Sequence, residues 1–184
     1  MKPAAERPRA SPPPTSDTRA RMPVSAGDCG LLLIRITIGL LMAGHGAQKL
    51  FGIFDGLGLG ATGKGFAALG YHPGRVYAAV AGISELLGGL GLALGLLTPL
   101  AAAALIGVMI NAMVTVTAAH GLWANTGGME YNVTIAAIAL AIAAIGPGRL
   151  ALDHPFRWGK GGWREAAVAL FLGGIGAAVV LLLT

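Results

Sequence analysis

Hydrophobic residues gather into five long segments along the chain, separated by connections rich in glycine, proline or charged residues. The segments cover residues 31–54, 76–97, 100–119, 130–145 and 166–184. A helix needs about 20 residues to cross a bilayer, so the first three are long enough and the fourth is short. Pro99 ends the second segment, because proline disfavours helix at the residue before it. The pattern predicts an all-α integral membrane protein, a four-helix transmembrane bundle plus a fifth, C-terminal transmembrane helix.

The same pattern divides the chain into three regions. Residues 1–26 are rich in Pro, Ser and Arg and cannot bury a core, so we expect a disordered tail there. Residues 27–153 hold the four-helix membrane domain. Residues 154–184 hold a basic loop and the last hydrophobic helix.

The connection between the first two hydrophobic segments, residues 52–74, is long and rich in glycine. It contains Gly58-x-Gly60-x-x-Gly63, a spacing found in nucleotide-binding loops, but no strand precedes it. We therefore interpret it as a flexible or interfacial segment in which Phe66 and Leu69 dip toward the membrane.

A polar stripe interrupts the first hydrophobic segment. His45, Gln48 and Lys49 follow one another at i, i+3 and i+4, so on a helix they share one face. The second segment is antiparallel to the first and carries Glu85. At 1.5 Å per residue, His45 and Glu85 lie roughly 9 and 14 Å from the same end of the bundle. We therefore expect His45 or Lys49 to be the partner of Glu85.

Two further ionisable residues come from the later segments. His120 follows the third segment and Glu130 opens the fourth, at the same end of the bundle. The candidate polar cluster therefore consists of Glu85, His45, Lys49, Glu130 and His120. No two of the histidines and carboxylates have the i, i+3 or i+4 spacing of ligands on one helix. A metal site from His45, His120, Glu85 and Glu130 is chemically conceivable but is not predicted.

Small residues surround Glu85 on its helix, and they indicate which way its carboxyl group points. The positions three and four residues away are Ala81, Gly82, Gly88 and Gly89. Small residues mark close contact between membrane helices, so Glu85 should face the bundle interior. On the third segment, Gly107, Asn111 and Thr115 form a similar small and polar face.

Three interpretations of this cluster stay open. An unpaired charge inside a membrane costs about 3 kcal/mol or more, so one interpretation is a structural clamp between two helices. The second is a functional site that contacts quinone or relays protons. The third is a protonated carboxylic acid without a role. In the second interpretation, Glu85 exchanges the quinone proton while His45 and Lys49 hold the quinone oxygen.

Composition supports the membrane assignment. The chain is 55% hydrophobic and only 11% charged, whereas soluble domains carry about 25% charged residues. The net charge of +5 comes without a basic stripe interleaved with aromatic residues, which argues against nucleic-acid binding. The single cysteine, Cys29, excludes an intramolecular disulfide and a redox-active dithiol within the chain.

Charged residues also predict the orientation, because cytoplasmic loops of membrane proteins are enriched in Lys and Arg. One side would carry Lys2, Arg7, Arg9, Arg19, Arg21, Arg149, Arg157, Lys160 and Arg164, and the other only Lys49, Lys64 and Arg75. The amino terminus is therefore predicted to be cytoplasmic and the carboxyl terminus extracytoplasmic. Arg35 lies near the cytoplasmic boundary, where its side chain is expected to snorkel to the interface.

Taken together, several short motifs resemble the DoxX family of small bacterial integral membrane proteins. They are Arg35, Gly39, His45-Gly46, Lys49-Leu50-Phe51, Glu85-Leu86-Leu87-Gly88-Gly89, Gly95-Leu96-Leu97-Thr98, Gly127-Gly128-x-Glu130-Tyr131, Gly146-Pro147-Gly148-Arg149 and Leu152-Asp153. The resemblance covers residues 31–153. The proline-rich tail and the fifth hydrophobic segment depart from it, because the family unit has four spans.

The resemblance implies a multi-pass protein of the bacterial inner membrane that is tied to redox biology. It implies a membrane subunit or anchor of a quinone-linked or oxidative-stress assembly, with quinone as the cofactor and redox enzyme subunits as partners. Such a protein is at most an accessory subunit of an oxidoreductase. The alternatives are a non-catalytic membrane scaffold and a small-solute or proton transporter. The family supplies no catalytic residues to carry over, so the roles of His45, Lys49 and Glu85 rest on the membrane argument alone.

Overall fold

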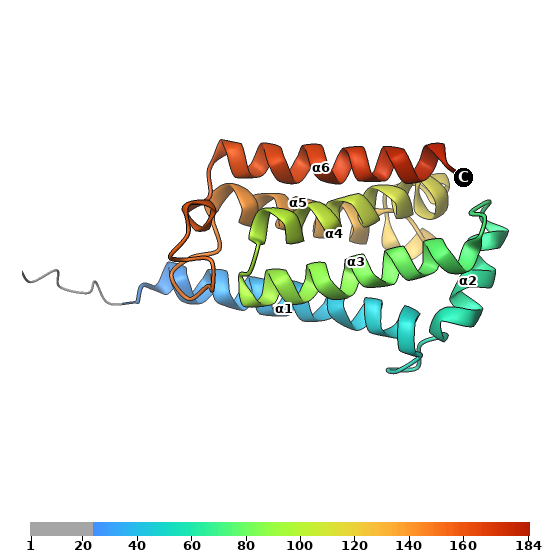
Figure 1. Cartoon of the computed structure of the whole chain (residues 1–184), viewed down its shortest axis with the longest axis horizontal. Coiled ribbons are helices and arrows are strands. Elements are labelled where there is room, and N and C mark those ends of the chain that lie inside the picture. The colour runs from blue at the N-terminus through green and yellow to red at the C-terminus, as the bar shows by residue number, and fades with distance from the viewer. Residues whose placement is uncertain (1–23) are drawn as a thin grey trace, which may run out of the picture.

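The computed structural model describes residues 24–184, and this part of the chain is helical without any strand. The helices are α1 (Ala26–Phe51), α2 (Gly58–Ala68), α3 (Gly74–Leu94), α4 (Thr98–Ala112), α5 (Glu130–Ile145) and α6 (Trp163–Leu182) (Figure 1). A π-helical turn, Met113–Thr117, and a 3₁₀ turn continue α4 to His120. The predicted all-α class is confirmed. The proposed disordered tail falls largely on residues 1–23, which lie outside the described residues.

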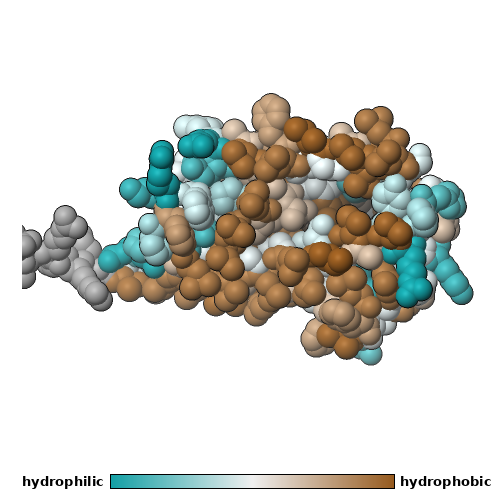
Figure 2. All heavy atoms as spheres, in the orientation of Figure 1, coloured by the Kyte–Doolittle hydropathy of each residue, from teal (hydrophilic) through white to brown (hydrophobic). Residues whose placement is uncertain are grey.

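Helices α1, α3, α4, α5 and α6 run along the length of the bundle, and α2 lies at one end of it (Figure 1). Four helices are long and apolar enough to cross a membrane: α1, α3, α4 with its continuation, and α6. The fifth, α5, is a shorter apolar helix of 16 residues. Hydrophilic residues gather at the two ends of the bundle, with hydrophobic residues between them (Figure 2). This arrangement is that of a multi-pass helical membrane protein.

Helices α1 and α3 pack with their backbones in close contact. A Cβ atom on Gly39 would lie 2.5 Å from the carbonyl oxygen of Gly89, and one on Gly46 would lie 2.5 Å from that of Gly82. No larger residue fits at these crossings, which explains why small residues line both helices. On the opposite side, a Cβ on Gly88 would approach Leu105 of α4 at 3.1 Å. The prediction that the small residues around Glu85 mark helix contacts is confirmed.

The hydrophobic core lies between α1, α3, α4, α5 and α6. Its fully buried members are Met42, Leu92, Ala102, Leu105, Ile106, Met109, Ile135, Ala139, Ile142, Ala143 and Ala169. Many of them are alanines, which lets the helices approach closely.

Helix α1 begins before its hydrophobic run, at Ala26. Ser25 caps it: the Asp28 amide donates to Ser25 Oγ at 3.1 Å, and the Ser25 amide donates to Asp28 Oδ2 at 2.9 Å. This reciprocal capping box satisfies backbone amides that the first helical turn leaves without partners.

The connection 52–74 is more ordered than the expected flexible segment, because it contains the helix α2. Gly63 allows this helix to pack on the start of α3, where a Cβ atom would lie 2.9 Å from Arg75 Cα. Phe66 and Leu69 then line a cavity inside the bundle end. Gly63 therefore serves close packing between α2 and α3.

The connection between α5 and α6 folds over one end of the bundle, which we call the closed end. Its central residue is Asp153, which is fully buried. The carboxylate accepts hydrogen bonds from the Leu97 amide at 2.9 Å, from the Thr98 amide and hydroxyl at 2.7 Å each, and from Trp158 Nε1 at 2.9 Å. Burial raises the pKa of Asp153, but the hydrogen bonds from Thr98, Trp158 and Leu97 outweigh burial and hold the pKa below its usual value.

Arg35 also belongs to the closed end, and the expectation that it snorkels to the membrane interface is wrong. It is fully buried, and its guanidinium donates to the carbonyl oxygens of Pro147, of Ala93 at 3.3 Å and of Leu150 at 3.1 Å. The side chain extends toward the end of the bundle where the sequence predicted it to meet the membrane interface, but the 146–162 connection covers that end. Arg35 therefore binds protein carbonyls in place of water or headgroups.

Candidate functional site

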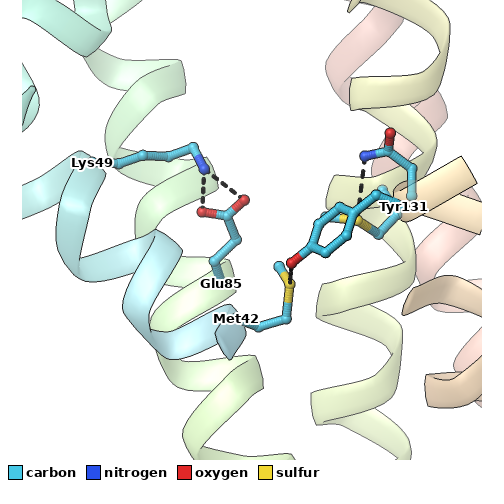
Figure 3. Close-up of polar contacts among 6 residues, drawn as sticks. Met42, Lys49, Glu85 and Tyr131 are labelled. Atoms are coloured by element: carbon cyan, nitrogen blue, oxygen red, sulfur yellow. Dashed lines mark hydrogen bonds and ion pairs between the residues drawn. The ribbon is translucent and has the colours of Figure 1, made fainter. Parts of the chain in front are cut away.

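An ion pair joins α1 to α3 at the other end of the bundle. Lys49 Nζ lies 2.6 Å from Glu85 Oε2 and 2.8 Å from Glu85 Oε1 (Figure 3). The Glu85 side chain is 4% exposed and the Lys49 side chain 27%. Gly82 lets the two helices approach here, since a Cβ atom on it would lie 2.8 Å from Leu50 Cγ and 3.4 Å from Lys49 Cβ. The expected pairing of Glu85 with Lys49 is present.

The ion pair lies on the wall of a cavity of about 370 Å³. The cavity is bounded by α3, α4 with its π-helical turn, and α6, and α2 with the residues after it lines one end. Most of the lining is apolar or small. The polar members of the lining are Lys49, Tyr71, Tyr77, Ser84, Glu85, Asn111 and Thr115. Sites for small molecules are typically apolar clefts of about 300 to 1,000 Å³ with a few polar groups, and this cavity has that character.

Tyr71 fixes the end of the cavity beneath α2. Its side chain is buried, and its hydroxyl donates to Asn111 Oδ1 at 3.3 Å. The amide nitrogen of Asn111 donates in turn to the Gly107 carbonyl at 3.0 Å. Tyr77 joins α3 to the end of α6, because its hydroxyl donates to the Leu183 carbonyl at 3.1 Å.

The helix that forms the cavity floor changes its winding at the site. The π-helical turn Met113–Thr117 continues α4, and Thr115 Oγ1 donates to the Asn111 carbonyl at 2.8 Å. Single π-helical turns occur frequently at functional sites, where they interrupt the regular helix. Thr115 and Val116 from this turn line the cavity.

His45 lies on α1 one turn before Lys49 but faces a different neighbour. Its ring makes an edge-on contact with the ring of Tyr131 on α5, with 5.8 Å between the ring centroids. The Tyr131 hydroxyl points to the sulfur of Met42 at 3.6 Å (Figure 3). His45 is not part of the cavity lining. It therefore belongs to the helix contact behind the ion pair.

His120 and Glu130 stabilise the connection between α4 and α5. Both are exposed. His120 Nδ1 lies 3.1 Å from the Val116 carbonyl, and a Glu130 carboxylate oxygen accepts from the Ala124 amide at 2.9 Å. Neither lines the cavity. Within residues 24–184, no three His, Cys, Asp or Glu side chains are arranged to hold a metal ion.

Several cavity residues had no counterpart in the sequence prediction. Tyr71 and Tyr77 reach the cavity from either side of the start of α3, and α6 contributes Gly173, Gly176 and Ala177. The three α6 residues follow one another at i, i+3 and i+4, which is the small-residue spacing that identified the face around Glu85. That signal was present in the last hydrophobic segment. Nothing in the sequence indicated which helix it would face.

Comparison with known families adds one finding. Residues 30–118 match the model of the DoxX family. This part of the chain belongs to the DoxX family. The comparisons with curated proteins and with solved structures give no match.

The DoxX region contains most of α1 and all of α2, α3 and α4, and with them Lys49, Glu85 and Asn111. Helices α5 and α6 lie outside the matched residues. The cavity is therefore composite, since the DoxX region supplies the ion pair and the floor while α6 supplies one side.

Proposed function

We propose that this DoxX-family membrane protein is the membrane subunit of a redox assembly and that its cavity binds the ring of a quinone. The observation that carries the proposal is the Lys49–Glu85 ion pair on the wall of a mostly apolar cavity of about 370 Å³. Quinone chemistry needs a proton-exchanging group and a hydrogen-bond donor inside the membrane, and this pair supplies both.

The two side chains take different roles in the proposal. An ammonium group has three donors, and two of those on Lys49 point to the two oxygens of Glu85. The third remains for a quinone carbonyl oxygen, which develops negative charge on reduction. Glu85 exchanges the proton that the reduced oxygen requires. Apolar lining residues such as Phe66 and Val108 contact the ring.

The electrons come from a partner enzyme subunit in this proposal. Reduction of a quinone consumes electrons as well as protons, and a chain with the single cysteine Cys29 has no dithiol to supply them. We place the closed end on the cytoplasmic side of the bacterial inner membrane, because Arg149, Arg157, Lys160 and Arg164 lie in the connection there or in the first turn of α6. Labelling of exposed Cys29 by a membrane-impermeant thiol reagent only after cell lysis would support this orientation.

Quinone binding by the purified protein in lipid nanodiscs tests the proposal. A charge-assisted hydrogen bond contributes about 1.5–3 kcal/mol, so Glu85→Gln and Lys49→Met should each weaken binding about tenfold or more. The matched controls are His120→Gln and Glu130→Gln, which change ionisable groups outside the cavity and should leave affinity unchanged. If the wild-type protein binds no quinone, with or without its partner, a non-catalytic scaffold becomes the better account.

A further inference from the structure

The rim of the cavity is apolar and open. Leu69, Val80, Val116 and Leu172 all line the cavity, and each is nearly half exposed. They come from the segment after α2, from α3, from the π-helical turn and from α6. On this face of the molecule a paler, recessed strip lies between the hydrophobic ridges of α6 and α3 (Figure 2). Within a bilayer these side chains meet lipid chains.

Aromatic side chains line the end of the cavity beneath α2. The rings of Phe66 and Tyr71 lie 5.3 Å apart, and those of Tyr71 and Tyr77 also lie 5.3 Å apart. All three line the cavity. The hydrogen bond from Tyr77 to the Leu183 carbonyl joins α3 to α6 above the same end. A ligand therefore meets the least obstruction at the side, between α3 and α6.

The charges at the site select an uncharged ligand. Lys49 and Glu85 neutralise each other, and the Glu85 side chain is almost fully buried. A charged ligand would have to separate this pair or be buried without a partner, and either is unfavourable. A neutral head with a carbonyl or hydroxyl oxygen can hydrogen-bond to the pair without separating it.

The α6 side of the cavity leaves room for a chain. A Cβ atom on Gly173 would lie 2.8 Å from the Ala103 carbonyl, so this glycine is needed for the contact with α4. Gly176 also lines the cavity, but a Cβ atom there would meet nothing within 4 Å. The backbone of α6 therefore borders empty space at Gly176.

We propose that the cavity admits its ligand sideways from the bilayer, between α3 and α6, and that this ligand is an amphiphile with one apolar chain. Its small, uncharged head lies at the Lys49–Glu85 pair, and its chain passes Gly176 to reach the lipid. The proposal rests on the proposed function for the head group but adds the route and the chain. Lipid chains are as apolar as the cavity wall, so moving the ligand's chain from the lipid into the cavity gains no hydrophobic free energy. The space available along the path therefore selects the chain.

Two glycines of α6 provide a matched test. Gly176→Phe places a ring in the proposed chain path, whereas Gly174→Phe places the same ring on a glycine that has open space but does not line the cavity. The probes are a quinone with a decyl chain and the same quinone ring without a chain, with the protein in phosphatidylcholine nanodiscs. We expect Gly176→Phe to weaken decyl-quinone binding about tenfold or more and to leave the chainless ring unaffected. Gly174→Phe should change neither affinity.

Unchanged decyl-quinone binding in Gly176→Phe would overturn the proposal, and so would equal weakening by the two variants. Thermal unfolding checks that both variants fold. If Gly176→Phe does not fold, Leu172→Trp, at the rim of the cavity, is tested in its place.

A second measurement separates the chain path from the head group. A long-chain alcohol that carries a photoreactive diazirine is cross-linked to the wild type and both variants in the same nanodiscs. Cross-links within residues 107–116 and 172–180, lost in Gly176→Phe and kept in Gly174→Phe, would support the path even if no quinone binds. Cross-links that Gly176→Phe leaves unchanged would overturn it.

Discussion

Two regions of the apolar bundle each contain a cation and a carboxylate. At the closed end they are Arg35 and Asp153, and at the cavity they are Lys49 and Glu85. Backbone groups hold the first two: Arg35 donates to three carbonyls, and Asp153 accepts from two amides as well as from Thr98 and Trp158. By contrast, every hydrogen bond recorded for the side chains of Lys49 and Glu85 joins them to each other.

This difference separates a structural site from a binding site. Backbone partners occupy the carboxylate at the closed end, and the surrounding connection excludes solvent from it. At the cavity, one donor of Lys49 and the remaining acceptor positions of Glu85 are left over and lie on the wall of an open space. Burial of ionisable groups is therefore a poor guide to function by itself. The hydrogen-bonding capacity left after folding is the better guide.

The largest expected effect is on stability, from Asp153→Ala. The substitution leaves the Leu97 and Thr98 amides without their acceptor at the start of α4, and a buried donor without a partner costs about 1–3 kcal/mol. We expect a loss of about 3 kcal/mol or more in the free energy of unfolding, measured by denaturant titration in detergent. His154→Ala, the exposed neighbour, is the control and should change stability little. A small effect of Asp153→Ala would remove the contrast between the two ends.

The ion pair at the cavity should show the opposite balance, with a modest effect on stability and a large one on binding. Lys49→Met leaves the buried carboxylate of Glu85 without its partner. The carboxylate can take up a proton, which removes the unpaired charge, so we expect a loss of only about 1–2 kcal/mol in the free energy of unfolding. The double variant Lys49→Met/Glu85→Gln should recover part of this loss, because no charge remains unpaired. A double-mutant cycle of unfolding and quinone titrations measures both quantities. Additive stability losses would show that the pair is not coupled.

The smallest effect is the pH dependence of the closed end. Because the pKa of Asp153 is held below its usual value in the folded protein, its ionised form favours folding. This contribution is fully present above the unfolded pKa of about 3.9 and is lost as the pH falls through the lower folded pKa. Unfolding temperatures measured between about pH 6 and pH 3 should therefore fall less steeply for Asp153→Asn than for the wild type. Equal slopes would show that Asp153 does not contribute.

Much of the architecture could be predicted from hydrophobic periodicity. The bounds of α5 coincide with the predicted fourth segment, Glu130–Ile145, and α3 and α6 begin within three residues of their predicted starts. Helix α1 began earlier than predicted, because a capping box extends a helix beyond its hydrophobic run. Helix α2 was missed because its four glycines are poor helix formers, and one of them, Gly63, is needed for close packing on α3.

The sequence by itself determined the membrane class and limited the expected partner of Glu85 to His45 or Lys49. Both follow from local rules, since helical spacing selects a face and consecutive membrane spans run antiparallel. Only the tertiary structure decided that Arg35 is buried against backbone carbonyls, that Asp153 accepts four hydrogen bonds and that α6 contributes to the cavity. Their partners lie far away in the sequence: Arg35 meets Pro147, and Asn111 meets α6 at Ala177. Such contacts depend on how whole helices and the 146–162 connection pack, and no local pattern encodes that packing.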